Sequence, residues 1–224
     1  MAARTVAKRS RAAPARAGYH HGDLPRALVT AAVELIRRDG PDAISLREVA
    51  RAVGVNHTAA YRHFEDKSAL LAAVAEQGFD TLATRMEAAV GAPAKRDAGS
   101  PKAGAPAADG LRALGATYLA FALESPAHYR VMFGPRLNES GRFPALEAAI
   151  SRAVAPLVEV VRGGIDRGEL RPGRALDLGM SFWTLTHGYT SLVLARRIRV
   201  KSPAAAAAYF ETVLRPLLDG LRRA

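Results

Sequence analysis

The sequence predicts an all-α protein of about nine helices, with a three-helix head followed by a larger helical region. Apolar residues recur at spacings of three and four residues over most of the 224 residues, as in amphipathic helices. Glycine and proline interrupt this pattern at intervals and divide it into separate helices. Residues 45–64 indicate two short helices joined by a tight turn, and the other elements are interpreted around them.

The first predicted helix starts at about residue 24. Asp23 is placed to cap it, and Pro25 falls in the first turn, where its missing N–H costs no helical hydrogen bond. Gly40 and Pro41 end the helix. Its apolar positions, at helical spacing, are Leu24, Leu28, Ala31, Ala32, Leu35 and Ile36.

The next two helices carry the clearest local signals. Ser45 and Glu48 fit a capping box, in which each side chain accepts the backbone amide of the other residue. Gly54 suits the left-handed position that ends a helix. Asn56 is a good N-cap for a second helix over residues 57–64.

That second helix has an outward face suited to DNA. Its spacing turns Ala60 and Phe64 inward. The residues left on the outward face are His57, Thr58, Tyr61, Arg62 and His63. From a helix in a major groove, such side chains reach base edges and phosphates. A fourth helix then begins at residues 66–68 and continues to about residue 89, and its N-terminal amides with Lys67 suit a phosphate.

Residues 91–109 separate these helices from the rest. They hold three prolines, three glycines and no large apolar side chain, which predicts a mobile loop. A helix follows up to Ser125, then a short helix over residues 127–134. A long helix over about 145–167 is expected to kink at Pro156.

The last two helices, over about 174–196 and 203–221, carry more apolar surface than one side can bury. We expect them to form a self-complementary interface that pairs two copies into a four-helix bundle. The alternative is that these faces only close the core of one chain.

Two motifs resemble a known family. The first runs Gly54-Val55, then Tyr61-Arg62-His63-Phe64, Lys67 and Leu70-Leu71, and it resembles the helix-turn-helix of TetR-family transcription regulators. The second joins Pro126-x-His128-Tyr129-Arg130-x-Met132-Phe133-Gly134 to Trp183-x-x-x-His187-Gly188, and it resembles a WHG-type C-terminal domain of that family. The string at residues 19–24 fits the same branch. The sequence has Ala59 and Ala60 where many members carry Thr and a larger aliphatic residue, which bears on a base contact at 59.

The resemblance implies a division of the chain. Residues 1–18 would be a disordered basic arm, 19–75 the DNA-binding domain with its helix-turn-helix at about 45–64, and 76–224 the effector-binding and dimerisation domain. The expected DNA contacts are Arg47, Asn56, His57, Thr58, Ala59, Tyr61, Arg62, His63 and Lys67.

The resemblance also implies a mechanism. A homodimer in the bacterial cytoplasm would bind a palindromic double-stranded DNA operator, repress transcription, and be released by a small apolar effector. The candidate effector pocket consists of Tyr118, Phe121, Met132, Phe133, Met180, Trp183 and His187. For each of these residues, plain core packing is the alternative.

Composition fits this interpretation and limits its rivals. The formal net charge of +11 points to an anionic partner, and a nonspecific DNA-coating protein is the main alternative. The basic residues of the arm either follow a DNA backbone or form a solvated tail. Without Cys, a Gly-x-Ser-x-Gly or a phosphate-binding loop, the sequence does not indicate an enzyme.

No cofactor, metal or membrane partner is expected. His20, His21 and Asp23 are adjacent, but neighbouring histidines do not share a helical face, and no further ligands fall at metal-site spacing. The longest uncharged run, residues 178–195, contains Ser, Thr, His and Gly throughout and suits a buried helix better than a membrane span.

Overall fold

The computed structural model describes residues 24–91, 106–134, 137 and 141–223. All regular elements within these residues are helices, which confirms the all-α prediction. They are α1 (Leu24–Asp39), α2 (Leu46–Val53), α3 (His57–Tyr61), α4 (Lys67–Val90), α5 (Ala107–Glu124), α6 (Pro126–Met132), α7 (Pro144–Asp166), α8 (Ala175–Leu194) and α9 (Pro203–Leu221). The predicted arm, the lead-in at 19–23 and residues 92–105 of the predicted loop lie outside the described residues.

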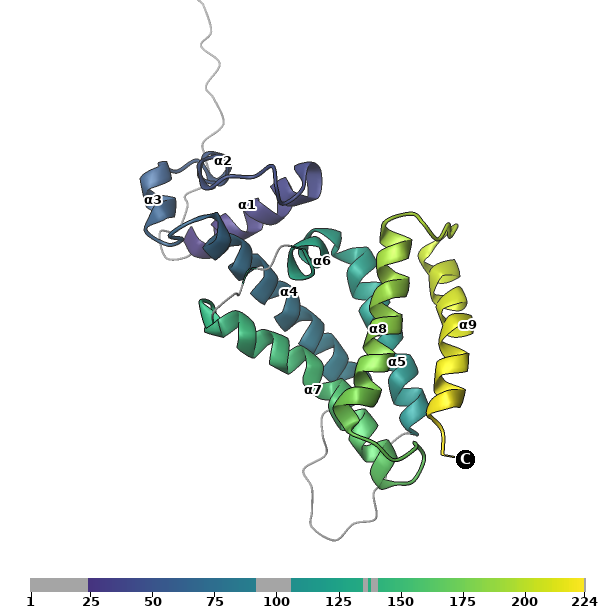
Figure 1. The fold of residues 1–224 in the computed structure, drawn as a ribbon. Helices are drawn as coiled ribbons and strands as arrows, with labels where there is room; N and C mark the ends of the chain where they lie inside the picture. The colour runs from purple at the N-terminus through teal and green to yellow at the C-terminus, as the bar shows by residue number, and fades with distance from the viewer. Residues whose placement is uncertain (1–23, 92–105, 135–136, 138–140, 224) are drawn as a thin grey trace, which may run out of the picture.

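Helices α1, α2 and α3 form the head at one end of the molecule, and α4 leads away from it (Figure 1). Leu28 and Ile36 of α1, Val49 of α2 and Ala60 of α3 are buried, as their spacing predicts. Phe64, just past α3, is buried as well. The head is therefore held by a small apolar core that leaves the other side of α3 free.

The caps of α2 and α3 form largely as predicted. The Ser45 hydroxyl accepts the Glu48 amide at 3.3 Å, but the Glu48 carboxylate accepts the Ser45 hydroxyl at 2.8 Å where the capping box predicts the Ser45 amide. Gly54 is left-handed, with φ of 81°. The Asn56 side chain accepts the Thr58 amide at 2.9 Å. These local bonds fix the angle between α2 and α3.

The second helix of this pair is shorter than the predicted 57–64 and ends at Tyr61. The Ala60 carbonyl accepts the amides of both His63 and Phe64 at 3.0 Å, which tightens the last turn. That turn still buries Phe64, so the inward direction of its side chain is as predicted.

One later boundary also differs from the prediction. The loop predicted to reach Asp109 ends earlier, because α5 begins at Ala107. The Ala107 amide donates to the Glu169 carboxylate at 2.6 Å, which fixes the first turn of α5. Helix α7 spans Pro144–Asp166, close to the predicted 145–167, and Pro156 is buried within it.

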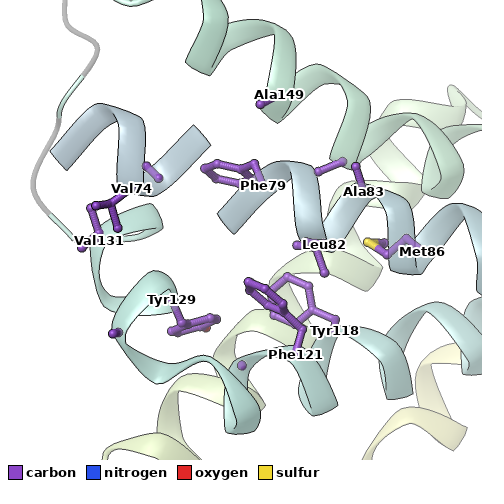
Figure 2. Close-up of a cluster of buried hydrophobic side chains, with 14 of the residues drawn as sticks. Val74, Phe79, Leu82, Ala83, Met86, Tyr118, Phe121, Tyr129, Val131 and Ala149 are labelled. Atoms are coloured by element: carbon purple, nitrogen blue, oxygen red, sulfur yellow. The ribbon is translucent and has the colours of Figure 1, made fainter. Parts of the chain in front are cut away.

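Helix α4 is the central element of the larger region and packs against α5, α6 and α7. In Figure 2, side chains from these four helices meet in one cluster, labelled Val74, Phe79, Leu82, Ala83, Met86, Tyr118, Phe121, Tyr129, Val131 and Ala149. Gly78 lets α6 approach α4 closely, because a Cβ there would lie 2.5 Å from the Met132 sulfur. Helix α8 packs against α5, α7 and α9, and α9 lies on the side of the larger region away from α4 (Figure 1).

Candidate functional site

The outward face of α3 and of the turn that follows it is called here the recognition face, and it consists of His57, Thr58, Tyr61, Arg62 and His63. All five side chains are exposed, and that of Tyr61 is 45% exposed. The His57 and Tyr61 rings meet edge to face, with centroids 6.5 Å apart. Within the part of the chain that the structure describes, none of the five forms an ion pair or a side-chain hydrogen bond. The face thus presents donors, acceptors and one aromatic hydroxyl to an external partner.

The remaining predicted DNA contacts lie around this face and differ in exposure and in their hydrogen bonds. Arg47 and Asn56 are exposed, whereas Ala59 is half-buried. Asn56 uses its side-chain oxygen to cap α3, which leaves its NH2 group to donate. Lys67 is half-buried and donates from Nζ to the Asp42 carbonyl at 2.8 Å, so it ties the α1–α2 connection to the start of α4. An ammonium has three donors, and this bond therefore leaves Lys67 able to contact a phosphate.

An arginine of the larger region also reaches the head. Arg142, just before α7, donates to the carboxylates of Glu65 and Asp66, at 2.9 Å each. Asp66 also caps α4 by accepting the Ala69 amide at 2.8 Å. These hydrogen bonds hold the pKa of the Asp66 carboxyl below its usual range, and the bond from the Ala69 amide has the larger effect, followed by that from Arg142. Local sequence patterns gave no signal for a pair separated by more than seventy residues.

A second group of polar side chains lies between α5, α6 and α8. The hydroxyls of Tyr118 and Tyr129 lie 2.8 and 3.0 Å from Nδ1 of His187. The Tyr129 hydroxyl also lies 2.9 Å from Oγ of Ser191. Phe133 and Trp183 flank the imidazole, with ring centroids 4.7 and 5.0 Å from it. These six residues are called the His187 cluster.

Burial sets the protonation of this cluster. It lowers the pKa of His187 and raises the pKa values of Tyr118 and Tyr129. The imidazole is therefore neutral near pH 7, with one ring nitrogen that accepts and one that donates. The hydroxyls and the imidazole satisfy one another inside an aromatic shell, which is an arrangement that specifies how α6 sits on α8.

The cluster contains four of the seven predicted pocket residues, which are Tyr118, Phe133, Trp183 and His187. Phe121 is buried next to them beneath Arg85, whose guanidinium carbon lies 5.8 Å from the ring centroid. Met132 packs against Gly78.

Met180 does not join the predicted pocket. Its side chain is 46% exposed, because this turn of α8 faces the surface. Sequence reasoning did not include Tyr129 and Ser191 in the pocket. Tyr129 lies within the quoted motif, and Ser191 follows His187 by one helical turn, so both had a usable signal.

The rings of the cluster are in contact, so a ligand that enters here has to displace a ring or separate α6 from α8. A surface hollow of about 330 Å³ lies elsewhere, between α1 and α4. It is lined by Arg26, Val29, Ala73, Glu76, Gln77, Asp80 and Thr81. Its charged and open lining does not suit an apolar effector, and the aromatic cluster is the better candidate.

The described residues contain no group of three His, Cys, Asp or Glu side chains that could hold a metal ion. None of their helices is long and apolar enough to cross a membrane. His20, His21 and Asp23 lie outside the described residues.

Family models match both parts of the molecule described above. Residues 28–74, which include the recognition face, match the model of the bacterial regulatory proteins of the tetR family. Residues 111–217, which include the His187 cluster, match the tetracyclin repressor-like C-terminal domain. The chain belongs to the TetR family. It is a TetR-family transcriptional regulator with a DNA-binding domain and not an enzyme. The WHG subtype stays a prediction, because the matched C-terminal model does not specify it.

Known relatives agree with this placement. An uncharacterized HTH-type transcriptional regulator of Mycobacterium tuberculosis is 25% identical over 197 residues, which are 88% of this chain and 80% of that protein. The structure of a protein of unknown function from Rhodococcus sp. RHA1 has a TM-score of 0.71 and 29% identity, over 92% of this chain and 98% of that one. The TetR-family regulator PfmR of Thermus thermophilus shares the fold, with a TM-score of 0.62 and 20% identity over 88% and 99% of the two chains.

Proposed function

We propose that this TetR-family regulator is a homodimeric repressor of the bacterial cytoplasm. In this proposal residues 19–75 bind a palindromic operator and residues 76–224 bind a small apolar effector that releases the DNA. The observation that carries the proposal is the exposed recognition face on α3, whose polar groups have no ion pair or side-chain hydrogen bond within the described residues. Such a face on a capped, rigidly packed helix is suited to base edges in a major groove.

Exposed apolar side chains support the dimer. Leu176, Met180 and Leu192 of α8 and Tyr209 of α9 are each between 46% and 50% exposed. Large apolar side chains gathered on two adjacent helices favour burial against a second copy. A twofold axis there gives the two recognition helices the symmetry of a palindrome, with half-sites about 34–36 Å apart or somewhat more.

The contacts of α6 support coupling between effector and head. Helix α6 touches α1 in the head, approaches α4 at Gly78, and bonds to α8 through Tyr129. An effector that separates α6 from α8 shifts the position of α6 against α1 and α4. It favours release only to the extent that it binds the released state more tightly.

Retention of sheared genomic DNA tests the proposal. The purified protein is incubated with DNA from its own genome, and the retained fragments are sequenced. Enrichment of one or a few palindromic sites is the expected result. Flat retention that disappears at moderate salt would instead indicate a nonspecific DNA-coating protein.

The same assay on a double variant separates the two functions further. His57→Ala with Arg62→Ala removes two side chains of the recognition face and should abolish the enrichment. A DNA-coating protein would keep its flat retention, because phosphate contacts made elsewhere do not depend on these two residues.

A further inference from the structure

The connection between α8 and α9 presents four cations within six residues. Arg196, Arg197, Arg199 and Lys201 are all exposed. Among the described residues, none of the four forms an ion pair or a side-chain hydrogen bond. Residues 196–201 are called the basic loop. Its unpaired charge contrasts with the arginines of α7, where Arg152 and Arg162 both pair with carboxylates.

The basic loop is held in one conformation. The amides of Arg197 and Ile198 both donate to the Leu192 carbonyl, at 2.8 and 3.2 Å. Ile198 and Val200 are half-buried against the core, and they alternate with the exposed Arg197, Arg199 and Lys201. The apolar side chains therefore hold the segment in place while the three cations project outward.

The first cation of the loop is held in a costly backbone conformation. Arg196 has φ of 56°, and it is the one non-glycine described with a positive φ. Glycine is the usual residue at such a helix end, because it adopts this conformation without strain. A cation there is favoured by the helix dipole, but that effect fades within the last turn and does not explain Arg199 or Lys201.

The basic loop lies at the same end of the larger region as the head (Figure 1). Helix α6 joins the two places, since it touches α1 and bonds through Tyr129 to Ser191 in the last turn of α8. The C-terminal end of α9 lies at the opposite end of the larger region, where the backbone of Arg222 forms an antiparallel bridge with that of Leu170. If α8 and α9 form the dimer interface, two copies of the basic loop lie near the twofold axis, at the end of the larger region that carries the heads.

We propose that the basic loop binds the phosphate backbone of the operator between its two half-sites. This inference rests on the proposed DNA-binding dimer. The contact is electrostatic and contributes affinity without sequence preference. DNA is favoured over an acidic protein or an anionic membrane as the partner because the loop and the recognition face lie at the same end of the molecule.

Salt titration of operator binding tests the loop. The variant Arg197→Gln, Arg199→Gln, Lys201→Gln keeps the backbone bonds and the apolar anchors. The matched control Arg171→Gln, Arg222→Gln, Arg223→Gln removes three exposed cations from the opposite end. If each protomer contributes one phosphate contact, the slope of log Kd against log salt concentration falls by about 2 for the loop variant. The control should keep the wild-type slope, and both variants should keep the wild-type preference among altered operators.

Three outcomes overturn the inference. The loop variant keeps the wild-type slope, or the control loses as much slope as the loop variant, or the loop variant changes its preference among operator bases. If the wild-type protein prefers no DNA site, the proposed function fails instead, and the same titration on a mixed-sequence duplex still decides whether the loop contacts phosphates.

Modified DNA gives a second measurement, in which the deciding comparison uses only the wild-type protein. Neutral methylphosphonates replace the phosphates between the half-sites. They should weaken binding of the wild-type protein and leave binding of a folded loop variant unchanged. Unchanged binding of the wild-type protein would overturn the inference.

Discussion

The recognition face and the His187 cluster are both rich in polar and aromatic groups, yet they differ in where those groups find partners. On α3 the side chains project into solvent and contact few protein groups. In the cluster, the hydroxyls of Tyr118 and Tyr129 and the ring of His187 bond to one another at 2.8 and 3.0 Å. The polar groups of the first surface are therefore free to bond an external partner, whereas any ligand of the second must replace bonds that already exist.

The largest expected effect is on the free energy of unfolding, and it distinguishes the surroundings of the His187 cluster from the recognition face. Phe121 is 1% exposed beside the cluster, and Phe121→Ala leaves a cavity that should lower the free energy of unfolding by about 3–5 kcal/mol. Tyr61→Ala, on the recognition face, should change it by less than about 0.5 kcal/mol. Urea denaturation followed by circular dichroism measures both. Equal losses would mean that the recognition face also supports the fold.

The next effect separates them by DNA affinity. Arg62→Ala should weaken specific binding by roughly 1–3 kcal/mol if the guanidinium makes a good base contact. Arg37→Ala is the matched control, because Arg37 is an exposed head arginine that pairs with Glu34 on its own helix at 3.0 Å. Fluorescence anisotropy with an operator duplex gives both affinities. A control that weakens binding as much as Arg62→Ala would reduce the role of Arg62 to general charge.

A third prediction concerns how tightly the cluster side is packed. Gly78→Ala places a methyl group against Met132 and should lower the free energy of unfolding by about 1–3 kcal/mol. Gly220→Ala meets no atom within 4 Å and should raise it by up to about 1 kcal/mol, since alanine is the better helix former. Thermal denaturation of the two variants should therefore shift in opposite directions. A stabilised Gly78→Ala protein would show that α6 does not pack closely on α4.

The smallest effect is a pH dependence of stability that arises from the cluster side. Burial holds the pKa of His187 below its unfolded value of about 6.5, and the same is true of His128. The unfolded chain therefore binds more protons as the pH falls below about 6.5, and stability should fall over the range down to the lowered pKa values. Urea denaturation between about pH 7.5 and pH 5 measures the slope. His187→Gln should make the slope shallower, and an unchanged slope would contradict a lowered pKa of His187 in the folded protein.

The sequence predicted local features better than distant contacts. Helix α9 and the caps at Gly54 and Asn56 depend on a few neighbouring residues, and these were predicted correctly. The pair between Arg142 and Asp66 joins segments 76 residues apart, and apolar spacing carries no information about it. Spacing also places Met180 on the same face of α8 as Trp183 and His187, but it does not tell which turn of that face is buried.

The uninterrupted length of α4 has a mechanical consequence. Its 24 residues rise about 36 Å, so one continuous helix links the head to the core of the larger region. If α4 tilts by about 5° about its C-terminal end, its N-terminal end at the head moves by about 3 Å. This is close to the 3.4 Å that separates successive bases along a DNA strand. A small repacking around α5 and α7 is therefore magnified by leverage into a displacement of the head by about one base step.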